Sequence, residues 1–324
     1  MKAQRGAAIL TAMLTVVLVA TLAASTLWQQ WRGVEVETAE RARTQSGWVL
    51  VGALDWARLI LREDARKGGA DHLAEPWAVP LAQARLSTFL AADRSDALAA
   101  DEAQDAFLSG QITDLQSRLN VANLVLDGKI HEPSRLAFSR LFKQLSLPEH
   151  ELARMADQLL LAQASGGVAQ GAEAAPAPPG AAPLLPQDFE QLAWLGLSAQ
   201  TLTVLRPFVT VLPVRTPVNL NTAPVEVIYA CVKKFDLADA HAFVTNRNLT
   251  HFASLQDVLK VAGSAATEFN QTQHSVTSQF FEVRGQLQIE QTRVQAQSVV
   301  QRENQEVKTL WQKRGVAPVM PPLQ

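Results

Sequence analysis

The sequence predicts an α+β fold in which a long amino-terminal helix packs on a small antiparallel sheet and a large all-helical domain is inserted between the strands. Three patterns lead to this prediction: an apolar amino-terminal run that continues as an amphipathic helix, a middle region with helical periodicity, and strict alternation near the carboxyl terminus. Apolar residues make up 48% of the 324 residues and charged residues 19%, which is typical of a folded chain.

The amino terminus contains a candidate transmembrane segment. Residues 7–28 form a run of 22 residues without a charge, which is long enough to cross the hydrocarbon core of a bilayer. Lys2 and Arg5 precede this run, and three glutamates follow it at positions 35, 37 and 40. The positive-inside rule therefore places the first residues in the cytoplasm and the rest of the chain across the membrane.

Three interpretations of this segment are open from its residues alone. A secretory signal peptide could be removed near Ala23-Ala24-Ser25, and an uncleaved anchor would need no further feature. In the third interpretation, residues 1–6 are a prepilin leader, a short basic stretch that ends in glycine, and cleavage falls between Gly6 and Ala7. The helical pattern beyond residue 28 favours the third, because a signal peptide does not normally continue as an amphipathic helix.

Residues 29–66 are predicted to continue the same helix. No proline occurs between Trp28 and Lys67. Apolar side chains recur at steps of four, three and four in this segment, as one face of a helix requires: Val49, Ala53, Trp56 and Ile60. One helix over residues 7–66 would be about 90 Å long, and Gly68-Gly69 would end it.

The middle of the chain divides into a first sheet segment and an insert. Residues 67–127 are assigned to the sheet domain, with loops and helix over 70–110 and a strand within 112–124. Residues 128–274 are predicted to form an inserted α-helical domain with a low-complexity loop at 165–186, which holds five prolines and four glycines. Its expected helices cover residues 133–145, 149–163, 187–195, 198–205, 223–233, 237–247 and 255–261. Ser254 and Asp257 form a capping pair for the last of them, and Gly263 closes it.

The carboxyl-terminal region is predicted to complete the sheet over residues 275–314. Phe281, Val283, Leu287 and Ile289 alternate with polar residues, and the same pattern recurs over 293–301. A period of two with one apolar face indicates a half-buried antiparallel strand pair. Residues 307–311 are a candidate third strand, and the proline-rich tail at 315–324 is expected to be disordered.

No set of residues predicts catalysis. The HExxH, G-x-S-x-G, Walker-type and G-x-G-x-x-G motifs are absent from the sequence. His241 and His251 are ten positions apart and are interpreted as surface histidines rather than as a metal pair. The acidic residues within 93–105 fit a solvated face better than a calcium site, and Cys231, the single cysteine, fits a buried apolar position. We therefore predict no enzymatic activity and no catalytic residue.

Residues 219–262 resemble a helix-hairpin-helix module, which in other proteins binds DNA. The backbone amides of a glycine-rich hairpin then approach phosphate at a helix start. The hairpin position here, residues 233–238, contains no glycine. Four basic residues balance four acidic ones over 219–262, and the whole chain has a formal net charge of −2, so no basic field would gather nucleic acid. A membrane-anchored DNA-binding protein of a competence-like uptake system is the alternative function.

Several segments together resemble the K-type minor pseudopilins of the bacterial type II secretion system. The similarity covers nearly the whole chain apart from the low-complexity loop and the tail. It is carried by Gln4-Arg-Gly6-Ala-Ala-Ile-Leu10, Gly52-Ala-Leu-Asp-Trp-Ala57, Asp114-Leu-Gln-Ser-Arg-Leu-Asn-Val-Ala-Asn-Leu124, Asn219-Leu-Asn-Thr-Ala-Pro224 and the strand pair from Phe280.

The resemblance implies a pilin-like fold and a role in filament assembly. A prepilin peptidase would cleave between Gly6 and Ala7 and methylate the new amino terminus at Ala7. The chain would be a single-pass protein of the Gram-negative inner membrane, with most of it in the periplasm. There it would initiate or cap a pseudopilus that exports folded proteins across the outer membrane. Its implied partners are the I-type and J-type minor pseudopilins and the major pseudopilin. The resemblance implies no nucleic-acid partner.

Two positions differ from the patterns of related subunits. Most pilins carry glutamate at the fifth mature position, which here is Thr11, and the K-type family shares this absence. A subunit at the filament tip has no neighbour to neutralise a carboxylate within the membrane, where such a charge is costly. The family's insert often carries an acidic, calcium-associated stretch, but residues 156–163 hold one aspartate. We predict no cofactor and no metal ligand, with calcium as the open alternative.

Overall fold

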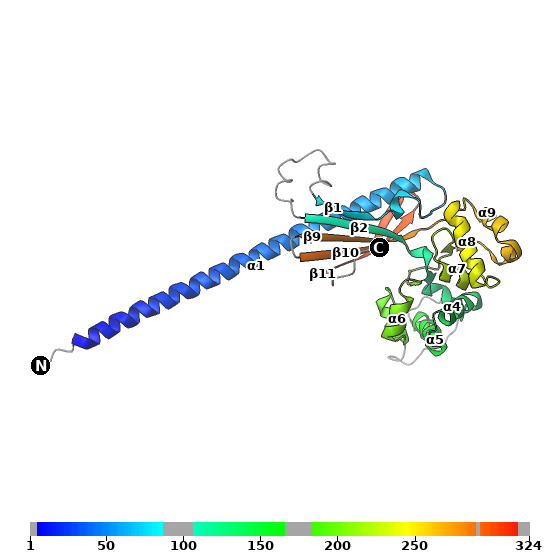
Figure 1. The fold of residues 1–324 in the computed structure, drawn as a ribbon. Coiled ribbons are helices and arrows are strands. Elements are labelled where there is room, and N and C mark those ends of the chain that lie inside the picture. The colour runs from blue at the N-terminus through cyan, green and yellow to red at the C-terminus, as the bar shows by residue number, and fades with distance from the viewer. Residues whose placement is uncertain (1–4, 87–105, 166–182, 290–291, 317–324) are drawn as a thin grey trace. The chain divides into compact units, whose positions relative to one another are not determined.

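The computed structural model describes residues 5–86, 106–165, 183–289 and 292–316. The chain divides into two compact units, residues 1–53 and 54–324. The helix expected over 7–66 is α1 (Arg5–Lys67), which runs through the first unit and continues into the second (Figure 1).

In the first unit, residues 8–41 of α1 expose their apolar side chains all around. Ile9, Leu14, Val17 and Leu22 each expose more than half of their surface. Among the described residues, α1 is the one helix that is long and apolar enough to cross a membrane. A helix that is apolar on every face needs lipid or other helices to cover it.

Two glycines end α1, as their positions in the sequence predicted. Gly68 and Gly69 have φ angles of 65° and 113°, in the left-handed region that glycine adopts without a steric penalty. The backbone N–H of Gly68 donates to the carbonyl of Asp64 at 3.1 Å, which closes the last turn. The chain then turns back toward the sheet.

The buried face of α1 within the second unit differs from the expected one. Leu54, Ala57 and Leu61 are buried, whereas Trp56 is 44% exposed and Ile60 is only partly buried. The row of buried residues on α1 is therefore shifted by one position toward the carboxyl terminus relative to the predicted row. Apolar residues are so dense here that both rows have the same helical spacing, and periodicity alone cannot choose between them.

The sheet has five antiparallel strands in the order β1-β2-β9-β10-β11 (Figure 1). The strands are β1 (Leu81–Arg85), β2 (Ala106–Asp114), β9 (Phe280–Ile289), β10 (Thr292–Glu303) and β11 (Glu306–Val316). Phe281 lies opposite Val300, and Leu287 lies opposite Val294, so the alternating apolar residues share one face. Phe281 packs there against Trp77, with ring centroids 5.2 Å apart.

Three sequence expectations about the strands need correction. β1 lies in a segment that was expected to hold only loops and helix. The strand expected within 112–124 is the end of β2, and the chain continues as the 3₁₀ turns η2 (Leu115–Ser117) and η3 (Val121–Leu124), because Asp114 and Asn120 cap them. Gly315 belongs to β11 rather than to a tail. The acidic residues within 93–105 and most of the low-complexity loop lie outside the described residues.

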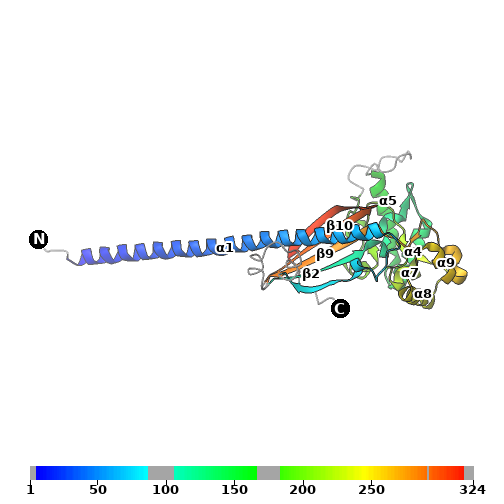
Figure 2. The same cartoon turned by 90° about the horizontal axis from the view of Figure 1, so that it is seen from above.

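The insert is mainly helical and gathers at one end of the sheet (Figure 1, Figure 2). Its helices are α4 (Glu132–Gln144), α5 (Glu149–Ser165), α6 (Ala199–Leu205), α7 (Val225–Cys231), α8 (Leu237–Leu249) and α9 (Leu255–Val261), with the 3₁₀ helices η4 (Glu190–Leu195) and η5 (Gly263–Glu268). Their apolar faces form one core that includes Phe138, Met155, Leu192 and Phe243. The Ser254–Asp257 capping box at α9 is present as expected.

Short strands lie in the insert and in the segments that flank it, and most of them were not predicted from the sequence. Two-residue parallel pairs join β3 (Leu119–Asn120) to β6 (Val209–Thr210) and β7 (Val218–Asn219) to β8 (His274–Ser275). An antiparallel pair joins β4 (Val125–Leu126) to β5 (Lys129–Ile130). These strands tie the segments that lead into and out of the insert to each other.

Candidate functional site at the junction of sheet and insert

A buried carboxylate lies at the centre of the junction between the sheet and the insert. Asp114 ends β2 and is 2% exposed. Its Oδ1 accepts the backbone N–H of Gln116 at 2.7 Å. Its Oδ2 accepts hydrogen bonds from the hydroxyls of Thr222 and Ser278, each at 2.6 Å, and from the side-chain amide of Asn219 at 3.1 Å. One side chain of the sheet thus binds two segments that are distant in sequence, one with Asn219 and Thr222 and the other with Ser278.

Asn219 is the partner of Asp114 on the insert side, and it is completely buried. Its Nδ2 donates to Asp114, to the hydroxyl of Ser278 at 2.9 Å and to the carbonyl of Asp71 at 3.2 Å. Its Oδ1 accepts the backbone N–H of Asn221 at 2.9 Å. Both ends of the amide are therefore used, as a buried amide requires.

Burial raises the pKa of Asp114 to about 6, although the hydrogen bonds from Ser278, Thr222 and Gln116 favour the ionised form. Three donors bind Oδ2, and an ionised carboxylate accepts hydrogen bonds better than a protonated one. Above this pKa, ionisation of Asp114 therefore strengthens these hydrogen bonds. Asp114 is almost fully buried, and its role in this arrangement is to connect segments.

A second set of charges adjoins Asp114 at the end of α1. Arg302 of β10 donates through Nη2 to both carboxylate oxygens of Asp71, at 2.5 and 2.7 Å, and through Nη1 to Asp64 of α1 at 2.6 Å. Asp71 also accepts the backbone N–H of Ser278 at 2.6 Å. Burial raises the pKa of Asp71, and the Arg302 charge opposes that shift. These bonds link the helix, the loop after it and the sheet.

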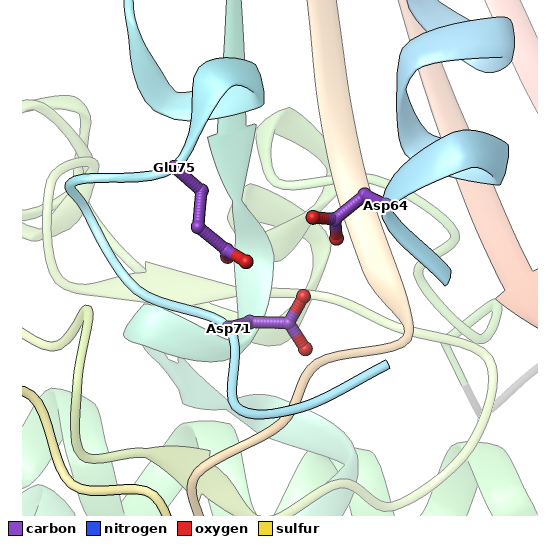
Figure 3. Close-up of side chains that lie close together, drawn as sticks. All are labelled: Asp64, Asp71 and Glu75. Atoms are coloured by element: carbon purple, nitrogen blue, oxygen red, sulfur yellow. The ribbon is translucent and has the colours of Figure 1, made fainter. Parts of the chain in front are cut away.

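Glu75 completes a group of three carboxylates with Asp64 and Asp71 (Figure 3). The three side chains point toward one another, one from α1 and two from the loop that follows it. Each offers an oxygen within 4.8 Å of the others, a spacing that a metal ion could bridge. Arg302 already supplies a cation to Asp64 and Asp71, and no further observation in the described residues points to a metal ion, so we assign no metal site here.

Three asparagines connect other segments near the same junction through hydrogen bonds to the backbone. Asn120 accepts the N–H of Leu212 and donates to the carbonyl of Val214. Asn123 forms a two-way pair with the backbone of Thr216, at 2.7 and 3.0 Å. Asn221 does the same with the backbone of Phe252, at 2.9 Å in both directions. Side-chain amides thus add to the short strand pairs that hold these segments together.

The family comparison covers part of this junction, including Asn219 and Thr222 but not Asp114 or Ser278. Family models described as "Type II secretion system (T2SS), protein K" match residues 117–214 and 218–277. The chain belongs to the protein K family of the type II secretion system.

Two relatives extend this likeness over most of the chain. A type II secretion system protein K of Pseudomonas aeruginosa is 28% identical over 317 residues, which cover 93% of this chain and 90% of the relative. A chain in the crystal structure of the GspK-GspI-GspJ complex from enterotoxigenic Escherichia coli matches with a TM-score of 0.64 at 18% identity. The match covers 86% of this chain and 99% of that one and shows a shared fold. The expected family and fold class are thereby confirmed.

The helix-hairpin-helix segment of this protein K is closed by contacts within the chain. Arg140 of α4 donates to the carbonyls of Tyr229, Val232, Lys233 and Phe235 at the hairpin. At the start of α8, the carboxylates of Asp236 and Asp239 occupy backbone N–H groups in a capping box. Such amides would have to bind phosphate in a DNA complex. The secretion assignment is therefore supported over the DNA-binding alternative.

The predicted processing residues lie elsewhere, at the start of α1. Gly6 and Ala7 fall within the helix, and the Thr11 hydroxyl donates to the carbonyl of Ala8 at 3.0 Å. Cleavage between Gly6 and Ala7 stays a prediction. The sequence did not predict the junction itself, although an asparagine between apolar neighbours, as in Val218-Asn-Leu, is a signal of a buried, bonded amide.

Proposed function

We propose that this protein K acts as the minor pseudopilin at the tip of the type II secretion pseudopilus, where it initiates or caps the filament. Its role is assembly rather than catalysis. It is processed between Gly6 and Ala7, methylated on Ala7 and held in the inner membrane by residues 7–28. Residues 29–314 lie in the periplasm.

The exposed apolar helix is the observation that carries this proposal. Its side chains between Ile9 and Trp31 are exposed in the part of the chain that the structure describes, and an isolated helix of this kind is stable only in lipid or against other apolar helices. Small residues along it, such as Ala12, Ala20 and Ala24, permit close helix packing. Thr11 bonds to its own helix and carries no charge, so this position needs no neighbouring amino terminus.

The rest of the chain consists of two parts that the polar junction connects. Residues 67–127 and 275–314 form the pilin-like domain, and residues 128–274 form the insert. The polar junction fixes one to the other, so that force or contact on the insert reaches the end of α1 through Asp114, Asp71 and Arg302. The similar chain from Escherichia coli was crystallised with GspI and GspJ. We infer that I-type and J-type minor pseudopilins are partners of this chain as well, along with the major pseudopilin.

Mass spectrometry of the amino terminus, on protein purified from native membranes, tests the processing step. An N-methylated Ala7 is expected, whereas an intact Met1 or a start near Thr26 would contradict the proposal. Gly6→Leu is the matched variant, because it blocks cleavage without changing the apolar helix. Co-purification with tagged I-type and J-type subunits tests the tip assignment, and loss of both partners from the correctly processed chain would overturn it.

A further inference from the structure

Two histidines that are 179 positions apart in sequence stack on each other beside the carboxylate group. His72 lies in the loop after α1, and His251 lies in the loop between α8 and α9. Their ring centroids are 3.7 Å apart and their planes are inclined by 13°. The neighbouring residue Phe252 is bound by Asn221 through its backbone, so the stack lies where the insert meets the loop after α1.

The charges that face this pair come from three elements. Asp64 belongs to α1, Asp71 and Glu75 belong to the loop that carries His72, and Arg302 belongs to β10. Arg302 binds the two aspartates. Glu75 instead accepts the backbone N–H of His72 at 2.9 Å and the indole N–H of Trp77 at 2.7 Å.

Glu75 changes its charge near neutral pH. Burial raises its pKa to about 7, against the opposing effect of the hydrogen bonds from His72 and Trp77. Acidification therefore neutralises this carboxylate early. The pKa of His72 is lowered from its ordinary value, so the negative charge that could offset a proton on His72 is reduced before His72 takes one up.

We propose that the His72–His251 stack is an acid-sensitive clasp, which holds the loop after α1 against the insert while the rings are neutral and releases it when both are protonated. Neutral rings at this spacing attract each other by stacking. Two imidazolium ions at the same spacing repel each other, and the repulsion is only partly screened by solvent.

The direction of the effect follows from the pKa of His72. Burial lowers this pKa, the His251 ring lowers it further, and Asp64 opposes both. The folded chain therefore binds a proton at His72 less readily than the unfolded chain does. The contribution of the clasp is complete above pH 6.5, the ordinary value for histidine, and it is lost as the pH falls below that value.

Hydrogen–deuterium exchange on the full chain in detergent micelles tests the clasp. Exchange is measured at pH 7.5 and pH 5.0 and divided by the intrinsic chemical rate at each pH. Protection of peptides that cover residues 68–75 and 248–254 is expected to fall about fivefold at pH 5.0, the size expected for two unit charges at this spacing in a water-like medium. Peptides from β9 and α4 should keep their protection.

Two variants decide the origin of the change. His251→Phe keeps a ring against His72 but cannot take a second proton, so the loss of protection at pH 5.0 should disappear. His241→Phe alters an exposed histidine of α8 and should behave as the parent chain does. The clasp is refuted if His251→Phe retains the same pH response, or if protection falls equally in β9 and α4.

Discussion

Arg302 on β10 binds Asp64 near the end of α1 at 2.6 Å, and this contact joins residues that are 238 positions apart. The same guanidinium holds Asp71 through two further bonds, so one side chain fixes the helix end and the loop after it to the sheet. Arg302 is 10% exposed at its side chain, and Asp71 is 3% exposed. In such a setting the loss of one partner leaves an uncompensated charge in a medium that solvates it poorly.

Replacing Arg302 with methionine should therefore lower the free energy of unfolding by about 3–5 kcal/mol at pH 7. The carboxylates left behind would take up protons more readily in the folded chain than in the unfolded one. The loss should consequently shrink as the pH falls toward 4. Guanidinium unfolding of the full chain in micelles measures both effects. Arg314→Met, at an exposed position of β11, is the control, and an equal loss in the two variants would contradict the assigned role.

A second prediction concerns the contact between Asn219 and Asp114. Asn219→Asp keeps the size of the side chain but places a carboxylate beside a buried carboxylate at the 3.1 Å contact. The variant should lose about 3 kcal/mol of stability at pH 7. The two groups would share a proton, which raises their joint pKa, so stability should rise again as the pH falls from 7 toward 5. Asn246→Asp on the exposed face of α8 provides the comparison, and a loss that does not depend on pH would argue against the carboxylate pair.

Local sequence patterns predicted the helices and strands of this fold better than the contacts between them. The alternation of Phe281, Val283 and Leu287 identified β9 because these side chains share a buried face of that strand, and Ser254 with Asp257 marked the start of α9. β1 was missed because its short sequence, Leu81–Arg85, shows no clear alternation of buried and exposed positions. The strand assigned within 112–124 was displaced because Asp114 and Asn120 cap turns there rather than face solvent.

The junction could not be predicted because its partners are distant in sequence. Asp114 and Asn219 are 105 positions apart, and a polar side chain carries no local pattern that names its partner. Both residues lie in segments that carry the family resemblance, but the resemblance did not predict that they are in contact. The same holds for His72 and His251, which are 179 positions apart in sequence and stack only in the folded chain.

A third prediction concerns His274, which is 2% exposed. Its Nδ1 accepts the backbone N–H of Asn270 at 3.4 Å, and its Nε2 has no hydrogen-bond partner within the described part of the chain. Burial lowers the pKa of His274 to about 4. The folded chain then binds fewer protons than the unfolded chain between pH 6.5 and pH 4, so stability falls as the pH falls through this window.

The size of that fall is bounded by the shift, at about 3 kcal/mol for this one group. His274→Gln removes the titration and retains an acceptor for Asn270. The stability advantage of the parent chain over this variant should therefore decrease between pH 7 and pH 4.5. Thermal unfolding in micelles at several pH values measures the difference. A constant difference across that range would show that His274 does not set the pH response, and His241→Gln controls for an exposed histidine.

The last prediction concerns Arg140 and the hairpin between α7 and α8. Arg140 donates five hydrogen bonds to four carbonyls of the hairpin and lies over the ring of Tyr229, with its guanidinium carbon 4.1 Å from the ring centroid. Cys231 lies at the end of α7 beside this arginine, and burial raises the pKa of its thiol to about 12. Cys231 is partly buried, and the raised pKa keeps its thiol protonated at neutral pH, so the thiol should react with a maleimide faster when the hairpin opens.

Arg140→Ala removes the side chain that holds the carbonyls together, whereas Arg140→Lys keeps the charge but loses the fork that reaches several of them at once. Labelling of Cys231 should become about tenfold faster in the alanine variant, as expected for a loss of about 1.4 kcal/mol in the free energy of opening, and less so in the lysine variant. Arg135→Ala, at an exposed position of the same helix, should leave the rate unchanged. Equal labelling rates in all four proteins would mean that Arg140 does not close the hairpin, and the amides of α7 and α8 would then have to be held by their own caps alone.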